Sequence, residues 1–276
     1  MSDIARICVI CNRKVRLTDK HYEIFKCDYC THVFTVKKCE DSELYSDTYF
    51  LKTHKNWFNN PDYRLFSFVH KNIKKLLKKD SLAICDLGCG KGVFLKYYRR
   101  LDSDSELFGV DLVRNSYPSI NFISEDFSRL DINKKFDVMC SFSVIEHLGE
   151  PQLFVDKIKK YLSADGVVII STINNNSMIH KIGHLLKQFG IKSAYERLYS
   201  SHHLQYFTNK SLRFLLEKNG FQVILQENHN YPLKAIDVPE AGKIARFFYL
   251  LIVYVIFTLQ AVFKNGILQT VVCRNK

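Results

Sequence analysis

The stretch Asp86-Leu87-Gly88-Cys89-Gly90-Lys91-Gly92 places a glycine at every second position after a short apolar run that begins at Leu82. Glycine adopts backbone angles that other residues rarely reach, and without a Cβ it lets the chain lie directly against a ligand. The stretch Val93–Arg100 that follows has the apolar spacing of a helix. The segment therefore predicts a strand, a tight turn and a helix. Taken alone, this glycine pattern also fits a dinucleotide site or a turn that binds nothing.

A carboxylate stands about 20 residues beyond the glycines, where a nucleotide-binding α/β fold places the residue that accepts hydrogen bonds from a ribose diol. It is Asp111, at the end of the second apolar run, Leu107–Asp111. A third run, Asn121–Phe127, and a fourth, Phe136–Ser143, continue the alternation of strands and helices. This alternation predicts an α/β fold with a mostly parallel sheet.

In this order the motifs resemble those of class I S-adenosylmethionine-dependent methyltransferases. The motifs are Asp86-x-Gly88-x-Gly90-x-Gly92, Asp111, Glu125-Asp126-Phe127, Phe136-Asp137-Val138 and Leu162-Ser163-Ala164-Asp165-Gly166. The last motif has Ala-Asp-Gly where the family usually has Pro-Gly-Gly, and we expect a turn there. The resemblance implies a Rossmann-like sheet whose last strand is antiparallel, which places a final strand pair at Phe221–Leu225 and Ile267–Val272.

The resemblance also implies the cofactor S-adenosylmethionine and the residues that bind it. It places Gly88 and Gly90 near the methionine moiety, Asp111 on the ribose hydroxyls, and Asp126 with Phe127 near the adenine. Three further residues complete the predicted cofactor site: Asp86, Gly92 and Ser143.

Two CxxC pairs near the start of the chain predict a structural zinc site. The ligands are Cys8, Cys11, Cys27 and Cys30, with fifteen residues between the two pairs. This spacing is typical of a zinc ribbon, and four thiolates leave no open position for a catalytic water. We therefore expect a zinc ribbon over residues 1–38, a connector over 39–61 and the methyltransferase domain over 62–276. Within that domain, residues 172–211 are expected to cover the substrate.

The combination of ribbon and cofactor motifs resembles the zinc-ribbon methyltransferases of bacterial sugar and surface-polysaccharide pathways. Glu146-His147-Leu148 and the segment His203–Thr208 contribute to this resemblance. It implies methylation of a free or lipid-linked sugar or glycan. One alternative is an O-methyltransferase of a quinone-like lipid, and another is an RNA-binding module or RNA methyltransferase. Nucleic acid is the less favoured partner, because Ser141-Phe142-Ser143-Val144 stands where an Asn/Asp-Pro-Pro-Tyr signature would be.

Two histidines are candidates for a general base, the group that methyl transfer to a hydroxyl requires. His147 follows the fourth predicted strand, and His203 lies in the predicted cover; a structural role is the alternative for each. With Glu146 they form the predicted catalytic set. Quinone-pathway methyltransferases are reported to bind a divalent metal through such a Glu-His pair and a further Glu. Ser143 stands at the position of that Glu, so no catalytic metal is expected.

The apolar residues 247–263 lack any charge and predict a hydrophobic helix over 245–263. Because it lies between two strands of one predicted sheet, we expect it at a membrane surface rather than across a bilayer. A dimer interface or the protein core is the alternative. The net charge of +12 suits anionic partners. The N-terminal residues lack the pattern of a secretory signal, so the expected location is the cytoplasm, with peripheral contact to the inner face of the cytoplasmic membrane.

Overall fold

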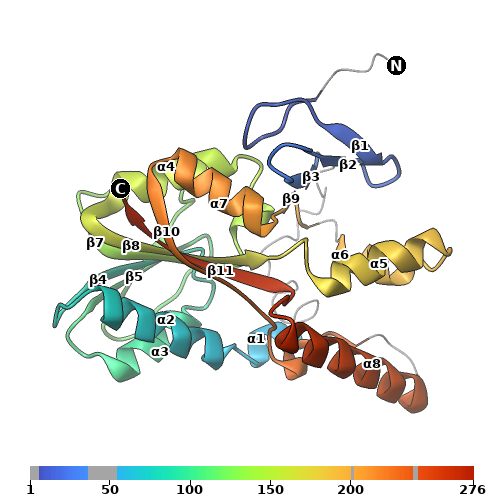
Figure 1. Ribbon diagram of the computed structural model, residues 1–276. Coiled ribbons are helices and arrows are strands. Elements are labelled where there is room, and N and C mark those ends of the chain that lie inside the picture. Colours follow the sequence, from blue (N-terminus) through green and yellow to red (C-terminus); the bar gives the residue numbers. More distant parts are fainter. Residues whose placement is uncertain (1–5, 37–54, 200–201, 239–241) are drawn as a thin grey trace.

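A computed structural model describes residues 6–36, 55–199, 202–238 and 242–276, which form a seven-stranded sheet with helices on both faces and a second, four-stranded sheet (Figure 1). The strands of the large sheet are β4 (Ala83–Leu87), β5 (Glu106–Asp111), β6 (Ile120–Ser124), β7 (Phe136–Phe142), β8 (Leu162–Ile173), β10 (Phe221–His229) and β11 (Leu268–Asn275). The helices are α1 (Lys55–Asn59), α2 (Tyr63–Leu76), α3 (Val93–Leu101), α4 (Pro151–Tyr161), α5 (Met178–Gln188), α6 (Ser193–Leu198), α7 (Asn209–Lys218) and α8 (Lys243–Val262), with the 3₁₀ helices η2 (Ile145–His147) and η3 (Leu233–Ala235).

The large sheet has the strand order β10-β11-β8-β7-β4-β5-β6. The strands from β6 to β8 pair in parallel, while β11 pairs antiparallel with both β8 and β10. This confirms the predicted fold, including the antiparallel last strand. The chain moves outward from β4 through β5 to β6 and then returns to β7 on the other side of β4. Ligands of open parallel sheets bind at such a reversal, beyond the carboxyl ends of the strands.

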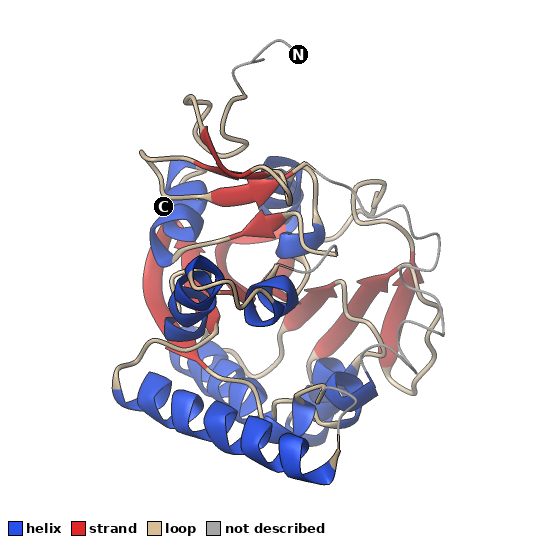
Figure 2. Ribbon diagram, turned by 90° about the vertical axis from the view of Figure 1, so that its right-hand side faces the viewer, coloured by secondary structure: helices blue, strands red, loops and turns tan. Residues whose placement is uncertain are grey.

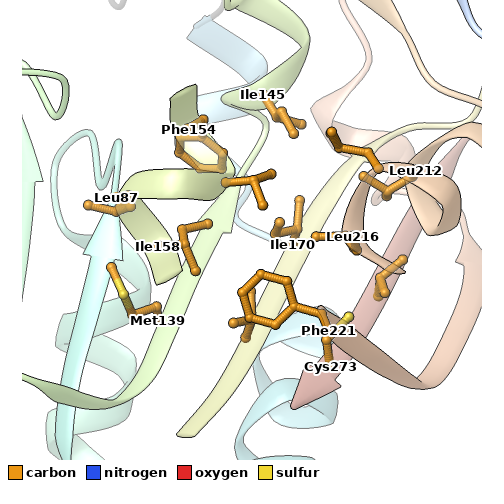
Figure 3. Close-up of a cluster of buried hydrophobic side chains, with 14 of the residues drawn as sticks. Leu87, Met139, Ile145, Phe154, Ile158, Ile170, Leu212, Leu216, Phe221 and Cys273 are labelled. Carbon is orange, nitrogen blue, oxygen red and sulfur yellow. The ribbon is translucent and has the colours of Figure 1, made fainter. Parts of the chain in front are cut away.

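Two hydrophobic cores lie on opposite faces of the sheet because successive strand residues point to opposite sides. On one face Ile84 packs with α2 and α3 in a cluster that includes Val69 and Phe94. On the other face Cys85 packs with α4 and α7 in a cluster that includes Phe154 and Leu212. Figure 1 shows α2 and α3 below the sheet and α4 and α7 above it. The α4–α7 side appears in Figure 3, where Ile158 and Leu216 approach the sheet from the two helices.

The prediction of a turn at Ala164–Gly166 is wrong. These residues lie inside β8, whose pairing with β7 jumps from Phe136–Leu162 to Val138–Val167. The extra residues on β8 form an irregularity in the ladder of the kind that a β-bulge produces. The strand therefore starts directly at the end of α4, without an intervening turn.

The four-stranded sheet joins the N-terminal segment to a distant part of the chain. Its strands are β1 (Arg16–Asp19), β2 (Ile24–Lys26), β3 (Val33–Thr35) and β9 (Gln205–Tyr206), all antiparallel. β9 belongs to the predicted cover, residues 172–211, which also contains α5 and α6. The predicted boundary at residues 38 and 39 lies outside the described residues. The described end of the predicted connector contains α1.

The predicted hydrophobic helix over 245–263 corresponds to α8, which lies at the margin of the molecule (Figure 1). Its C-terminal end leads into β11 through Gly266. A Cβ at Gly266 would lie 2.2 Å from the carbonyl oxygen of His229, the last residue of β10. Glycine therefore permits the close approach of the two strands beside the helix.

Candidate functional site

Positive φ angles shape the turn that follows β4. Gly88, Gly90 and Gly92 have φ angles of +73°, +52° and +67°, which glycine adopts at little cost. A Cβ at Gly88 would lie 2.3 Å from Cγ2 of Val144, and one at Gly92 would lie 2.6 Å from Cζ of Phe122. A Cβ at Gly90 would instead project into open space. The outer two glycines thus permit close packing, whereas the middle one leaves space beside the turn.

Asp111 holds this turn in place from the end of β5. Its Oδ2 accepts a hydrogen bond of 2.7 Å from the backbone N–H of Gly90, and its Oδ1 accepts one of 2.9 Å from Val113. Asn115 donates from Nδ2 to the Gly90 carbonyl oxygen at 2.6 Å. A carboxylate offers about four acceptor positions, of which these bonds use two. Asp111 therefore orders the glycine turn and retains acceptor capacity for a ligand.

A cavity of about 150 Å³ lies beside the turn and is lined by Asp86, Gly88, Gly90 and Ser143, four of the predicted cofactor residues. Asp86 is buried, and within the described residues its Oδ1 atom has no hydrogen-bond partner. Burial raises the pKa of this carboxyl well above its usual range, and the negative charge of Asp111 raises it further. An ammonium or sulfonium ligand would compensate such a carboxylate. The donor and charge pattern therefore fits S-adenosylmethionine, which carries both cations.

Ser143 reaches the cavity from the end of β7 in a conformation that is rare for a residue other than glycine. Its φ angle is +55°, and its N–H donates to the Ser171 carbonyl oxygen of β8 at 2.9 Å. Such backbone strain often accompanies functional sites. Ser143 and Ser171 both line the cavity at the carboxyl ends of neighbouring strands.

The residues predicted near the adenine lie outside the lining of this cavity. Asp126 accepts a hydrogen bond of 2.8 Å from the N–H of Ser128 through Oδ1, which stabilises the turn after β6. The ring of Phe127 packs edge-on against Phe154, with centroids 5.3 Å apart. Gly92 and Asp111 are not among the lining residues either, although Asp111 bonds directly to Gly90, which is.

The predicted catalytic residues come together beyond the carboxyl end of β7, outside the residues that line the cavity. Glu146 is buried and its Oε2 accepts a hydrogen bond of 2.7 Å from the hydroxyl of Thr172. Burial raises the pKa of the Glu146 carboxyl to about 7, although the Thr172 bond opposes this shift. At neutral pH this carboxyl therefore carries a proton in a large part of the molecules.

A single backbone carbonyl orients the imidazole of His147. Its Nδ1 lies 2.9 Å from the carbonyl oxygen of His202, which can only accept a hydrogen bond. Nδ1 therefore carries the ring proton, and Nε2 is unprotonated. Burial lowers the pKa of His147 below 6.5, which keeps the ring neutral at pH 7. The ring of His203 lies edge-on to it, with centroids 4.8 Å apart. His147 thus has the tautomer and the charge of a general base.

Glu146, His147 and His203 also offer three ligand atoms within 4.8 Å of one another. The sequence alone offered two potential metal ligands, Glu146 and His147, because Ser143 stands at the position of the third ligand. The structure adds His203, which lies 56 residues beyond His147 in the chain and reaches it only through the fold. A carboxylate and two imidazoles form a ligand set that transition metals accept.

The four cysteines of the N-terminal segment converge on one point. Their sulfurs lie within 4.8 Å of one another, with Sγ–Sγ distances of 3.5 Å for Cys8–Cys30 and for Cys11–Cys27. A tetrahedral zinc ion with Zn–S bonds of about 2.3 Å needs sulfurs roughly 3.8 Å apart. The hydrogen bond between Cys8 and Cys30 lowers the pKa of the Cys8 thiol and raises that of the Cys30 thiol. This donor set fits zinc.

The cysteine-bearing segment is linked to the histidine pair by a chain of hydrogen bonds. His32 follows Cys30 and, since burial lowers its pKa to about 4, its neutral ring donates from Nε2 to Gln205 Oε1 at 2.9 Å. Gln205 donates from Nε2 to the carbonyl oxygen of Leu148, next to His147. The N–H of Leu204 in turn donates to the carbonyl oxygen of Glu146 at 2.8 Å. The four-stranded sheet therefore helps to position the candidate base.

Sequence reasoning missed part of the cavity wall. Trp57 of α1 lies in the predicted connector, and Tyr231 and Pro232 follow β10, yet all three line the cavity. Trp57 is the one tryptophan of the chain, and its ring packs edge-on against Tyr231 with centroids 5.2 Å apart. A lone tryptophan two residues before Asn-Asn-Pro was a signal that could have drawn attention to this segment.

Comparisons with known proteins agree on the large sheet. Residues 61–226 match the model of a family described as a methyltransferase domain. The sheet resembles a SAM-dependent methyltransferase from Archaeoglobus fulgidus, with a TM-score of 0.53, 18% identity, and coverage of 83% of this chain and 100% of that one. It also resembles the Burkholderia thailandensis 1,6-didemethyltoxoflavin-N1-methyltransferase, with a TM-score of 0.52, 14% identity, and coverage of 95% and 99%.

Curated relatives are named for a different pathway from the one that we expected. The Dictyostelium discoideum mitochondrial ubiquinone biosynthesis O-methyltransferase is 29% identical over 36% of this chain and 37% of its own length. The Rickettsia akari ubiquinone biosynthesis O-methyltransferase is 25% identical over 51% and 64%. The chain thus matches less than two thirds of either relative. These names overturn the expectation of sugar or glycan methylation in surface-polysaccharide biosynthesis.

We predict that alanine at Gly90 and alanine at Gly88 have different effects. Gly90→Ala should cost about 1–2 kcal/mol of stability for its positive φ and weaken S-adenosylmethionine binding at least roughly tenfold, because its Cβ enters the cavity side of the turn. Gly88→Ala should lower the melting temperature further, because its Cβ also meets Val144. Thermal unfolding and calorimetric titration measure both effects. Equal melting temperatures for the two variants, or undiminished binding by Gly90→Ala, would contradict this description.

Proposed function

This chain belongs to the methyltransferase-domain family, and from that premise we propose that it transfers a methyl group from S-adenosylmethionine to a hydroxyl of a quinone-like lipid. The observation that carries the proposal is the neutral, oriented imidazole of His147 beside the carboxyl end of β7. Hydroxyl methylation needs such a base. The names of the curated relatives supply the substrate class.

The residues around the glycine turn account for cofactor binding. Asp86 would pair with a cationic group of the methionine moiety, and the backbone of Gly88 and Gly90 would lie against it. Asp111 keeps that backbone in place and would accept hydrogen bonds from the ribose. When bound, the cofactor supplies an electrophilic methyl group on a positively charged sulfur. The main task of the protein is then to align donor and acceptor.

His147 accounts for the proton of the acceptor hydroxyl. As the oxygen forms its bond to the methyl carbon and the bond from that carbon to sulfur breaks, the hydroxyl proton moves to Nε2 of His147. The His202 carbonyl oxygen accepts the Nδ1–H throughout and stabilises the imidazolium that results. His203 packs against this ring and limits its rotation.

The cavity wall suits an aromatic, apolar acceptor. Trp57, Phe66, Phe142 and Tyr231 contribute aromatic rings to it. Such walls bind planar rings through apolar burial and edge or stacking contacts. A quinol-like ring with an apolar tail has this character, whereas a sugar offers many hydroxyls that these side chains cannot satisfy.

We predict that His147→Gln lowers kcat for methylation of a prenylated catechol roughly 100-fold or more, while S-adenosylmethionine still binds. His21→Gln, a change at an exposed histidine, serves as the control and should retain wild-type activity. Because protonation removes the Nε2 lone pair and the pKa of His147 lies below 6.5, wild-type kcat/KM should fall with decreasing pH only below that value. The acid limb should disappear in His147→Gln.

If the folded protein binds the cofactor but methylates no phenolic hydroxyl, the proposed substrate class is wrong. Full activity of His147→Gln would refute the role of the base. The production of S-adenosylhomocysteine measures both.

We also propose that Cys8, Cys11, Cys27 and Cys30 bind one zinc ion with a structural role. The four converging sulfurs support it, as does the small size of a segment that cannot bury a core of its own. Because β3 pairs with β9 next to the histidine pair, metal binding would stabilise the position of His147 as well as the segment itself.

We predict that the purified protein contains zinc in a ratio of one ion per chain, measured by elemental analysis. Cys27→Ala should lose the ion and part of the methyl-transfer activity, because β3 no longer holds β9 firmly. Cys273→Ala, which changes a buried cysteine of β11, should retain the ion. A zinc content near zero in the wild type, or full zinc content in Cys27→Ala, would show that the cluster is not a zinc site.

A further inference from the structure

α8 lacks the polar outer face of an ordinary surface helix. Its inward stripe consists of Tyr249, Val253, Phe257 and Gln260, spaced as one side of a helix requires. The residues of its opposite side are exposed and apolar: Phe247, Phe248, Leu251, Ile252, Val255 and Leu259, here called the α8 outer face. Helices of soluble proteins place polar residues there, whereas helices that are apolar all round contact lipid or protein.

The neighbouring helix α5 enlarges this apolar surface. α5 lies beside α8, and the exposed Leu185, Phe189 and Ile191 lie at or just beyond its C-terminal half. Figures 1 and 2 show both helices at the same side of the molecule, away from the large sheet. Exposed apolar side chains therefore occur on two neighbouring helices at this side of the molecule.

The charges around this surface indicate which partner it fits. Lys243, Arg246 and Lys264 flank the outer face, and residues 243–276 contain no Asp or Glu. The α5 segment 178–192 is likewise free of acidic residues. A second copy of this chain would bring the same positive charges to the contact, on a protein of net charge +12, and would be repelled. An anionic lipid surface attracts such flanking cations and accepts the apolar side chains between them.

The connections of α8 determine how it would lie in a bilayer. Among the described residues, α8 is the helix that is long and apolar enough to cross a membrane, by length and composition. Its twenty residues span about 30 Å, close to the thickness of the hydrocarbon layer. However, β10 before it and β11 after it pair with each other along their length. Both ends of the helix must therefore remain on the same side of the membrane.

We propose that the α8 outer face and the adjoining residues of α5 dock the protein on the surface of an anionic lipid bilayer. In this arrangement α8 lies in the plane of the interface, with Phe247, Phe248 and Ile252 among the acyl chains. Lys243 and Arg246 contact the headgroups at one end of the helix, and Lys264 contacts them at the other.

The docking surface adjoins the cavity. Phe257 on the inner side of α8 packs edge-on against Tyr231, with centroids 5.5 Å apart, and Tyr231 lines the cavity. The helix α8 and the Phe257–Tyr231 pair thus lie between the bilayer contact and the cavity. If the acceptor is the lipid of the proposed function, this arrangement brings the cavity next to the phase in which the acceptor is dissolved.

Flotation of the full-length protein with vesicles tests the docking without substrate or cofactor, so its outcome is separate from that of the proposed activity. The protein should float with vesicles of phosphatidylcholine and phosphatidylglycerol, and much less with phosphatidylcholine alone. The double variant Phe248→Glu/Ile252→Glu should reduce the bound fraction roughly tenfold or more, because two charges enter the lipid layer. Lys243→Gln/Arg246→Gln should weaken binding to the anionic vesicles only.

The matched control is Leu17→Glu/Leu101→Glu, which makes the same charge change on β1 and α3. Leu17 and Leu101 are 50% and 52% exposed, close to the 55% and 59% of Phe248 and Ile252. The control should float almost as the wild type does, and unfolding curves should show that all variants fold. Failure of the folded wild type to float would overturn the proposal. So would equal flotation of the α8 variant and the control. A stable dimer that Phe248→Glu/Ile252→Glu dissociates, without vesicle binding, would identify the surface as a contact between copies.

Discussion

The hydrogen bond from the Gly90 N–H to the Asp111 carboxylate is the interaction on which the site depends. It joins the turn after β4 to the end of β5 and so fixes the backbone that borders the cavity. The backbone of the turn can follow this course because glycines stand at the positions where a side chain would clash. Behind it, one oxygen of the buried Asp86 carboxyl has no hydrogen-bond partner in the described part of the chain, which creates a place for a cation at the point where the strand order reverses. Local backbone geometry and buried charge thus specify the same ligand.

A second set of contacts connects parts that are far apart in the sequence. β3 of the cysteine-bearing segment pairs with β9, and the residues before β9 bond to Glu146 and orient His147. The cover, the candidate base and the predicted zinc site therefore form one mechanical unit. On the opposite side, α8 joins the cavity wall through Tyr231 and Phe257. Elements from both ends of the chain thus support the site, the N-terminal segment at the candidate base and α8 at the cavity wall.

The sequence predicted the features that depend on local pattern. The glycines, Asp111 and the apolar runs gave the parallel sheet and its antiparallel last strand, because spacing and strand periodicity are local properties. It could not place His203 beside His147 or Trp57 beside the cavity, since tertiary contacts bring these together. The turn expected at Ala164–Gly166 was wrong because these residues continue β8 as extra residues of the strand, in the stretch where its register with β7 jumps from Leu162 to Val167. The predicted substrate class was wrong because motifs shared across a family identify the cofactor better than the acceptor.

Titration calorimetry with S-adenosylmethionine measures whether the glycine turn and Asp111 form the cofactor site. The wild type should bind the cofactor in a one-to-one ratio, and Asp111→Ala should bind at least roughly tenfold more weakly, because the Gly90 N–H loses its acceptor and the ribose loses its partner. Leu101→Ala, at an exposed position of α3, should bind as the wild type does. A folded wild-type protein that gives no binding heat at several temperatures, or an Asp111→Ala variant with unchanged affinity, would show that the turn and Asp111 do not hold the cofactor in this way.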